Sequence, residues 1–230
     1  MYELYIGNKN YSSWSLRPWL LMRAQSIPFK ERLVQFAPGS NWSAFRSFSP
    51  NGRVPSLHDG KTVVWDSLAI VEYLAERHPA VWPVDATMRA WARSAASEMH
   101  SGFAELRNRC GMSCGLRVKL NEIGTGLRAD ITRVDEIWKE GLVRFAGPYL
   151  AGARFSAVDA FFAPVVFRVQ TYSLPLSKTA STYAERMLAE PAMREWYDAA
   201  IAEPYREPGH EAEVAEAGTV TTDLRAKPIS

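Results

Sequence analysis

The sequence predicts an α/β domain over residues 1–79, followed by an all-helical domain over residues 86–205. Three observations lead to this prediction: strand and helix patterns alternate before residue 80, breaker residues cluster at 78–83, and strand patterns largely stop beyond them. The length of 230 residues suits two modest domains, since one domain takes roughly 100–200 residues. A hydrophobic fraction of 47% is ordinary for a folded globular chain.

The pattern of the first domain is βαβ followed by ββα. Two strand candidates, residues 3–6 and 31–36, enclose a helix pattern at 16–25. After a loop rich in Ser, Pro, Asn and Gly, two more strand candidates flank Asp59-Gly60, a dipeptide that favours a two-residue hairpin. A final helix pattern over residues 67–77 places apolar side chains on one face. The loop and the two hairpin strands lie at residues 38–52, 56–58 and 61–65.

Beyond the linker from His78 to Pro83, whose prolines interrupt regular structure, the patterns are helical. Ser156 and Asp159 have the spacing of a capping box, with Asp in place of Glu, and mark a helix start. Residues 206–230 are small, charged and punctuated by Pro and Gly, so we expect an extended or partly disordered C-terminal tail. The expected helices lie at about 86–109, 118–145, 156–169, 180–189 and 191–202.

Composition excludes several classes of function. The 27 Lys and Arg residues are nearly balanced by 25 Asp and Glu, whereas binding a polyanion requires a clustered basic surface, so we expect no nucleic-acid partner. Residues 1–7 do not resemble a secretory signal, and no apolar run approaches the roughly 18 residues of a membrane span. Two cysteines, Cys110 and Cys114, are too few for a secreted disulfide framework, and we expect reduced thiols in a cytoplasmic protein. The four histidines have no metal-ligand spacing, and we expect no metal.

Three short motifs of the first domain place polar groups beside the starts of helices or strands. Ser, Asn and Asp are preferred helix caps, so ordinary capping explains the helix-start motifs when each is taken singly. A hydroxyl beside a helix N-terminus also stabilises an anion, which is the functional alternative. The motifs are Asn10-Tyr11-Ser12-Ser13-Trp14-Ser15 before the first helix, Arg53-Val54-Pro55-Ser56 before the hairpin, and Trp65-Asp66-Ser67 before the helix at 67–77.

In this order and at these intervals, the motifs resemble the glutathione transferase superfamily over residues 1–205, together with the run Phe155 to Asp159 in the helical domain. The opening run is similar to that of its Ser-type, zeta- and theta-like bacterial members. The resemblance implies a thioredoxin-like N-terminal domain, an all-α C-terminal domain, glutathione as co-substrate and a homodimer. It also implies a cis bond before Pro55, pairing of the Val54 backbone with the cysteinyl part of glutathione, and a γ-glutamyl site at Asp66 and Ser67. Arg53 belongs to the same set of binding residues.

The chemistry that this resemblance implies is the formation of a thiolate. A free thiol has a pKa of about 8.5, and a hydrogen-bond donor at a helix N-terminus lowers that value. We expect Ser12 or Ser13 to be this donor. An ungapped alignment of the first strand instead puts the usual catalytic Ser on Asn10, whose amide is an alternative donor, and the phenol of Tyr11 is another. The first domain has no Cys, which excludes thiol–disulfide exchange at this turn.

The second substrate is expected between the domains, along the first long helix of the helical domain. The candidates there are Met99, His100, Phe103 and Arg107, with Tyr11 from the first domain; core packing is the alternative for Met99 and Phe103, and a structural hydrogen bond for His100. The predicted function is conjugation of glutathione to a small, partly apolar electrophile, as in detoxification. Two alternatives stay open: a glutathione-dependent isomerase of the maleylacetoacetate type, using Arg17 and Arg107 for a dicarboxylate, and a non-catalytic glutathione-binding module.

Overall fold

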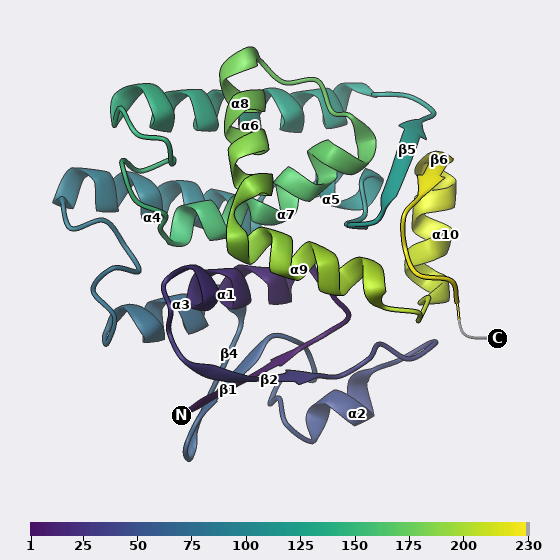
Figure 1. The fold of residues 1–230 in the computed structure, drawn as a ribbon, viewed down its shortest axis with the longest axis horizontal. Coiled ribbons are helices and arrows are strands. Elements are labelled where there is room, and N and C mark those ends of the chain that lie inside the picture. Colours follow the sequence, from purple (N-terminus) through teal and green to yellow (C-terminus); the bar gives the residue numbers. More distant parts are fainter. Residues whose placement is uncertain (229–230) are drawn as a thin grey trace.

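The computed structural model describes residues 1–228, and its N-terminal part is the expected α/β domain (Figure 1). The strands form one sheet in the order β2-β1-β3-β4, in which β1 and β2 are parallel and the other neighbours antiparallel. The predicted βαβ unit followed by ββα is confirmed. The elements are β1 (Tyr2–Ile6), α1 (Ser13–Ala24), β2 (Phe29–Leu33), α2 (Trp42–Arg46), β3 (Ser56–Asp59), β4 (Thr62–Trp65) and α3 (Ser67–Ala75).

The sheet is fixed by apolar side chains on its helix-covered face and by the predicted hairpin. Leu4 of β1 pairs with Leu57 of β3, and both side chains are fully buried. Asp59 pairs with Thr62 across the hairpin, and Gly60 has a φ of 59°, a conformation that glycine adopts without strain. The structure also adds α2, a short helix inside the loop at 38–52.

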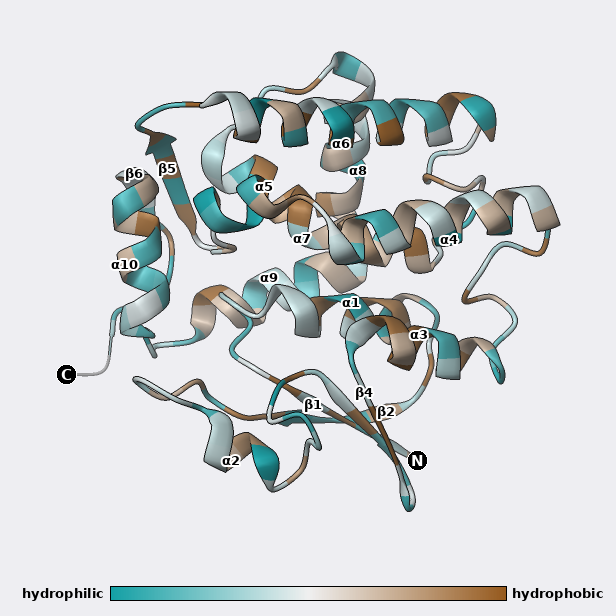
Figure 2. Cartoon of the chain, turned by 180° about the vertical axis from the view of Figure 1, so that it is seen from behind, coloured by the Kyte–Doolittle hydropathy of each residue, from teal (hydrophilic) through white to brown (hydrophobic). Residues whose placement is uncertain are grey.

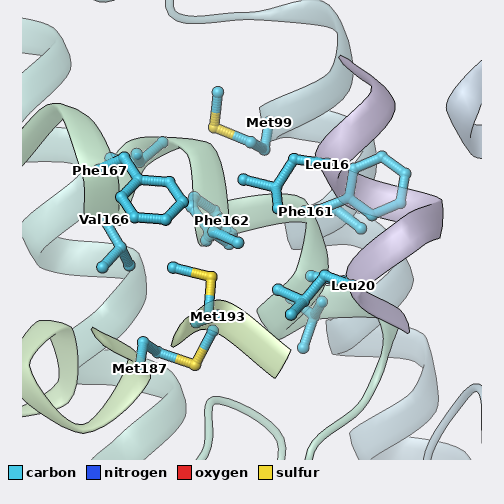
Figure 3. Close-up of a cluster of buried hydrophobic side chains, with 14 of the residues drawn as sticks. Leu16, Leu20, Met99, Phe161, Phe162, Val166, Phe167, Met187 and Met193 are labelled. Carbon is cyan, nitrogen blue, oxygen red and sulfur yellow. The ribbon is translucent and has the colours of Figure 1, made fainter. Parts of the chain in front are cut away.

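The second part of the chain is dominated by helices, with α7 at its centre. α7 packs on α1 of the first domain and on α4, so one continuous apolar core joins the two parts (Figure 3). Figure 2 shows hydrophobic residues in the central α7 and many hydrophilic ones along the peripheral α6 and α10. The predicted capping box at Ser156 and Asp159 is present at the start of α7. The helices are α4 (Ala86–Ser101), α5 (Ala104–Arg109), α6 (Thr125–Arg144), α7 (Ala157–Tyr172), α8 (Lys178–Ala189) and α9 (Pro191–Ala202).

Two of the expected helices are interrupted or shortened in the structure. The helix expected at 86–109 is interrupted at Gly102, which is extended, and at Phe103, whose φ is 61°. The helix expected at 118–145 starts only at Thr125, because residues 116–120 form the strand β5 (Leu116–Leu120). In β5 the apolar Leu116 and Val118 are buried, while the cationic Arg117 and Lys119 that alternate with them are more exposed, which is the alternation of a strand.

The C-terminal segment differs most from expectation. Residues 206–230 were expected to be extended or partly disordered, but they contain α10 (Pro208–Ala217) and β6 (Gly218–Asp223); residues 229 and 230 lie outside the described range. Glu207 caps α10, Pro208 occupies its first turn, and Val214 is buried. β6 pairs antiparallel with β5, which supplies the backbone partners that this segment lacks by itself. Within residues 1–228, no helix is both long and apolar enough to cross a membrane.

Candidate functional site

The turn between β1 and α1 distinguishes its two neighbouring serines. The Ser12 hydroxyl donates to the hydroxyl of Ser15 at 2.7 Å, and that oxygen also accepts the backbone N–H of Gly7 at 3.2 Å. Ser13 is the first residue of α1, and its hydroxyl has no hydrogen-bond partner within residues 1–228. Ser13 therefore has a free donor at a helix N-terminus, whereas Ser12 is already engaged.

Both serines line a cleft of about 360 Å³ between the sheet domain and the helical part of the chain. Val54 lines the same cleft, and the peptide bond between Val54 and Pro55 is cis, as the resemblance implies. Arg53 lies beside Val54 on this wall. The other walls come from the loops near Phe36 and Gly111, from α1 and α2, and from α5, α7 and α10. The lining residues are Tyr11, Ser12, Ser13, Trp14, Phe36, Asn41, Phe45, Gly52, Arg53, Val54, Arg107, Gly111, Met112, Arg168, His210 and Glu213.

The other two candidate donors at this turn are engaged elsewhere. Asn10 is fully buried and does not line the cleft; its amide nitrogen donates to the carbonyl of Ala200 in α9. Tyr11 lines the cleft, but its hydroxyl donates to Glu211 of α10 at 2.8 Å. Burial, and then the hydrogen bond with Glu211, raise the pKa of Tyr11, so its proton is held firmly. An ungapped alignment compares positions along the chain only, so it does not show that the side chain of Asn10 points away from the cleft, towards α9.

Asp66 and Ser67 lie at the start of α3, outside the set that lines the cleft. Asp66 caps the helix by accepting the N–H of Leu68 at 2.8 Å, and its φ of 75° is a strained value for a residue other than glycine. The buried hydroxyl of Ser67 accepts a hydrogen bond of 3.3 Å from Arg17 of α1. His100 Nε2 lies 3.6 Å from the Asp66 carboxylate.

The cleft is bordered by arginines that the described residues do not neutralise. Arg107 and Arg168 line it, and behind Trp14 lies Arg17, which is fully buried. None of the three has a carboxylate within 4.0 Å in the part of the chain that the structure describes. Burial, and then the charges of Arg107 and Arg168, lower the pKa of Arg17 well below its usual value. Such a group of cations favours an anionic ligand.

The candidates on the helical domain have different surroundings. Met99 is fully buried in the core shown in Figure 3, and Phe103 is nearly buried; neither lines the cleft. His100 packs edge-on against Trp14, with ring centroids 5.3 Å apart. Burial lowers the pKa of His100, and the positive charges of Arg17 and Arg107 act in the same direction, against the Asp66 carboxylate. Burial therefore favours the neutral form of His100.

Sequence reasoning missed Arg168, His210 and Glu213, which line the cleft from α7 and α10. Arg168 donates to the carbonyls of Cys110 and Pro164, and 4% of the residue is exposed. One signal for it was available: an Arg within an otherwise apolar helix run is rarely buried without a role. No local signal marked His210 or Glu213, because their segment has no apolar periodicity of its own.

Comparison with known proteins identifies the family. The glutathione S-transferase N-terminal domain matches residues 11–77, and the glutathione S-transferase C-terminal domain matches residues 89–199. The chain belongs to the glutathione S-transferase family. The predicted architecture and the predicted class of glutathione-dependent enzyme are thereby confirmed at the level of the family.

The relatives of this glutathione S-transferase family member include proteins named as isomerases and as transferases. A probable maleylacetoacetate isomerase of Vibrio cholerae is 27% identical over 79% of this chain and 89% of its own length. Glutathione S-transferase Z1 of Arabidopsis thaliana is also 27% identical, over 77% of this chain and 87% of its own length. The theta-class glutathione S-transferase of Xanthomonas axonopodis pv. citri, solved with glutathione bound, is 26% identical with a TM-score of 0.63, covering 85% of this chain and 96% of that one.

Proposed function

We propose that the chain binds glutathione in the cleft and that Ser13 donates a hydrogen bond to its sulfur. One observation carries the choice of Ser13: among the hydroxyls at residues 11–13, those of Tyr11 and Ser12 are committed to Glu211 and Ser15, while that of Ser13 has no partner within the described range. A donor at a helix N-terminus favours the thiolate, whose formation at neutral pH is otherwise incomplete. The thiolate then attacks a small electrophile.

The remaining glutathione contacts are proposed in the cleft and at the start of α3. The Val54 backbone is the proposed partner of the cysteinyl part, with Arg53 beside it. Asp66 and Ser67 are the proposed γ-glutamyl site, which is supported by the strained φ of Asp66 and by the cation of Arg17 against the Ser67 hydroxyl. The glutathione-bound Xanthomonas structure supports glutathione as the co-substrate. A homodimer, a cytoplasmic location, a detoxifying role and the absence of a metal remain part of the proposal.

The electrophile is proposed to lie against α5 and α7, where Arg107, Met112 and Arg168 border the cleft. These cations also favour a second candidate, a glutathione-dependent isomerase acting on an acceptor with carboxylates. The names of relatives from Vibrio cholerae and Caenorhabditis elegans, both probable maleylacetoacetate isomerases, point the same way. Transient addition of the thiolate serves isomerisation, and lasting addition or substitution serves conjugation. If the reaction yields an isomerised acceptor and free glutathione, the enzyme is an isomerase.

The test compares Ser13→Ala with Ser12→Ala and Asn10→Ala in steady-state conjugation. Ser13→Ala is expected to lower kcat/KM about 10- to 100-fold, the scale of one hydrogen bond to a charged group, with the Kd for glutathione little changed. Ser12→Ala is the matched control, because its hydroxyl points to Ser15. If Ser13→Ala is as active as the wild type, the assignment of the donor is wrong. Glutathione binding without turnover of any electrophile would favour the non-catalytic module instead.

A further inference from the structure

A buried carboxylate and a histidine form a pair at the start of α10, and the histidine lines the cleft. One oxygen of Glu207 lies 2.7 Å from Nδ1 of His210 and also accepts the backbone N–H of His210 at 2.7 Å. Burial raises the pKa of Glu207, but hydrogen bonds from the backbone and side chain of His210 outweigh it and hold the pKa below its usual value. An ionised carboxylate only accepts, so Nδ1 carries a hydrogen and Nε2 is left as the basic nitrogen.

The imidazole of His210 is held against the turn between β1 and α1. Its ring stacks on Tyr11 with centroids 4.9 Å apart and on Phe36 with centroids 5.4 Å apart. Tyr11 directly precedes Ser12 and Ser13, and these residues line the same cleft as His210. Nε2 has no hydrogen-bond partner within residues 1–228, and a third of the side chain is exposed, at 33%. Stacking on Tyr11 and Phe36 and the hydrogen bond from Nδ1 to Glu207 therefore hold the ring in place, and Nε2 has no hydrogen bond within the described residues.

The charged and titratable groups around His210 come from every wall of the cleft. Glu211 and Glu213 share its helix, and Glu207 is the N-cap of that helix. Glu211 is hydrogen-bonded to Tyr11 and to Arg225, which follows β6. Other lining residues of the cleft are cationic, namely Arg53, Arg107 and Arg168. Tyr11 keeps its proton, since its hydroxyl donates to Glu211. Histidine is the side chain in this group that ordinarily exchanges a proton near neutral pH.

The proposed function leaves one requirement unmet, which is where the thiol proton goes. Ser13 stabilises the thiolate by donating a hydrogen bond, but a neutral hydroxyl that donates does not take up a proton. On the basis of that proposed function, we propose that His210, oriented by Glu207, is the general base that accepts the thiol proton of glutathione at Nε2. This arrangement, a base held by a carboxylate beside a nucleophile, is the general form of an activated nucleophile.

The proton and electrons balance in this step. The S–H bond breaks, its electron pair stays on sulfur, and the proton forms an N–H bond at Nε2. The sulfur pair then forms a C–S bond with the acceptor. In an addition, the imidazolium returns the proton to the acceptor atom that has received the displaced electron pair; in a substitution, the leaving group departs with its bonding pair and the imidazolium releases the proton to water.

Helix capping alone does not require this imidazole. The cap consists of the Glu207 carboxylate and the backbone N–H of His210, and any residue other than proline at position 210 supplies that N–H. A cap also makes no use of stacking against Tyr11 and Phe36. Replacing the side chain at 210 therefore separates the two roles, because the cap persists while the base is lost.

The experiment records the pH profile of kcat/KM for the wild type and for His210→Gln, His210→Phe and Glu207→Gln in the full chain. His210→Gln is expected to lower kcat/KM about 100-fold or more at about pH 6.5, with the Kd for glutathione within about threefold of the wild type. The loss is expected to shrink to within about tenfold at about pH 9, where the thiol ionises without a base. His210→Phe, which keeps the stacking, should behave in the same way, and Glu207→Gln should lie between. His78→Gln, in the linker, is the matched control.

Four results would overturn the inference. A wild-type pH profile in His210→Gln would show that no proton passes through this residue. An equal loss at low and high pH, or a wild-type profile in His210→Phe, would assign the ring a packing role only. If wild-type protein gives no binding heat with glutathione, the proposed function fails and this inference fails with it; if glutathione binds and only the pH profile is unmoved, the inference alone fails. Thermal melting of each variant confirms that it is folded.

Discussion

Asp159 is expected to tolerate replacement by Asn far better than replacement by Ala. Its carboxylate, fully buried at the start of α7, accepts the N–H of Leu150 at 3.0 Å, the N–H of Ser156 at 2.9 Å and the hydroxyl of Tyr183 at 3.0 Å. Asp159→Ala leaves these three buried donors without a partner, and each unsatisfied group costs about 1–3 kcal/mol. Allowing for relaxation, we expect the free energy of unfolding to fall by about 3–5 kcal/mol.

Asp159→Asn keeps one of the two oxygens and removes a buried charge. The bonds from Leu150 and Tyr183 go to the same oxygen, Oδ1, so an amide oxygen there retains both. The two bonds to Oδ2, from the backbone N–H and the hydroxyl of Ser156, are lost. Burial raises the pKa of Asp159 to about 6, against hydrogen bonds that lower it. The cost of the charge is about 3 kcal/mol at neutral pH, since one pKa unit is worth about 1.4 kcal/mol. This relief offsets the lost bonds, and Asp159→Asn should change the stability by less than about 2 kcal/mol.

The same residue predicts a pH dependence with a definite sign. A carboxyl whose folded pKa is raised binds its proton more tightly in the folded state, so its contribution to stability improves as the pH falls from about 6 towards about 4. Wild-type protein should therefore gain stability relative to Asp159→Asn over that range. Urea unfolding at several pH values measures both effects. A loss below about 1 kcal/mol for Asp159→Ala, or equal losses for the two variants, would refute this reasoning.

The remaining predictions concern the C-terminal segment and the cleft. Tyr11→Phe is expected to leave kcat/KM within about threefold of the wild type, because the hydroxyl is committed to Glu211, and to cost about 1–3 kcal/mol in urea unfolding; a large loss of rate would make Tyr11 the sulfur donor. Arg225→Ala removes the bonds to Glu211 and Asp223 and should speed proteolytic cleavage after Arg206, whereas unchanged cleavage would mean that β6 alone holds the segment. Arg168→Gln should raise KM about tenfold or more for a carboxylate-bearing acceptor and little for a neutral one; equal changes for both would refute an anion site.

The parts of the fold that were predictable depend on local sequence. Strand alternation, the Asp59-Gly60 turn and the capping box at Ser156 are each decided within a few residues, and the structure has all three. β5 and β6 were missed because neither is stable alone: their backbone groups pair across about a hundred residues of chain. The break between α4 and α5 depends on the positive φ of Phe103, which the helix periodicity does not encode.

The same distinction applies to the candidate site. Ser13, Val54 and Asp66 come from motifs that are contiguous in the sequence and therefore visible in it. Arg168 and His210 reach the cleft through the packing of α7 and α10, which no local pattern specifies. The choice between Ser12 and Ser13 also lay beyond the sequence, because it depends on a single hydrogen bond to Ser15.

The most direct test of the central claim is a spectroscopic titration of the thiol of enzyme-bound glutathione in the wild type, Ser13→Ala and Ser12→Ala. We expect a thiol pKa well below the free value of about 8.5 in the wild type and in Ser12→Ala. In Ser13→Ala we expect a rise of about 1–2 pKa units, the equivalent of one lost hydrogen bond to a charged sulfur. An unchanged thiol pKa in Ser13→Ala, or a rise in Ser12→Ala alone, would contradict the claim.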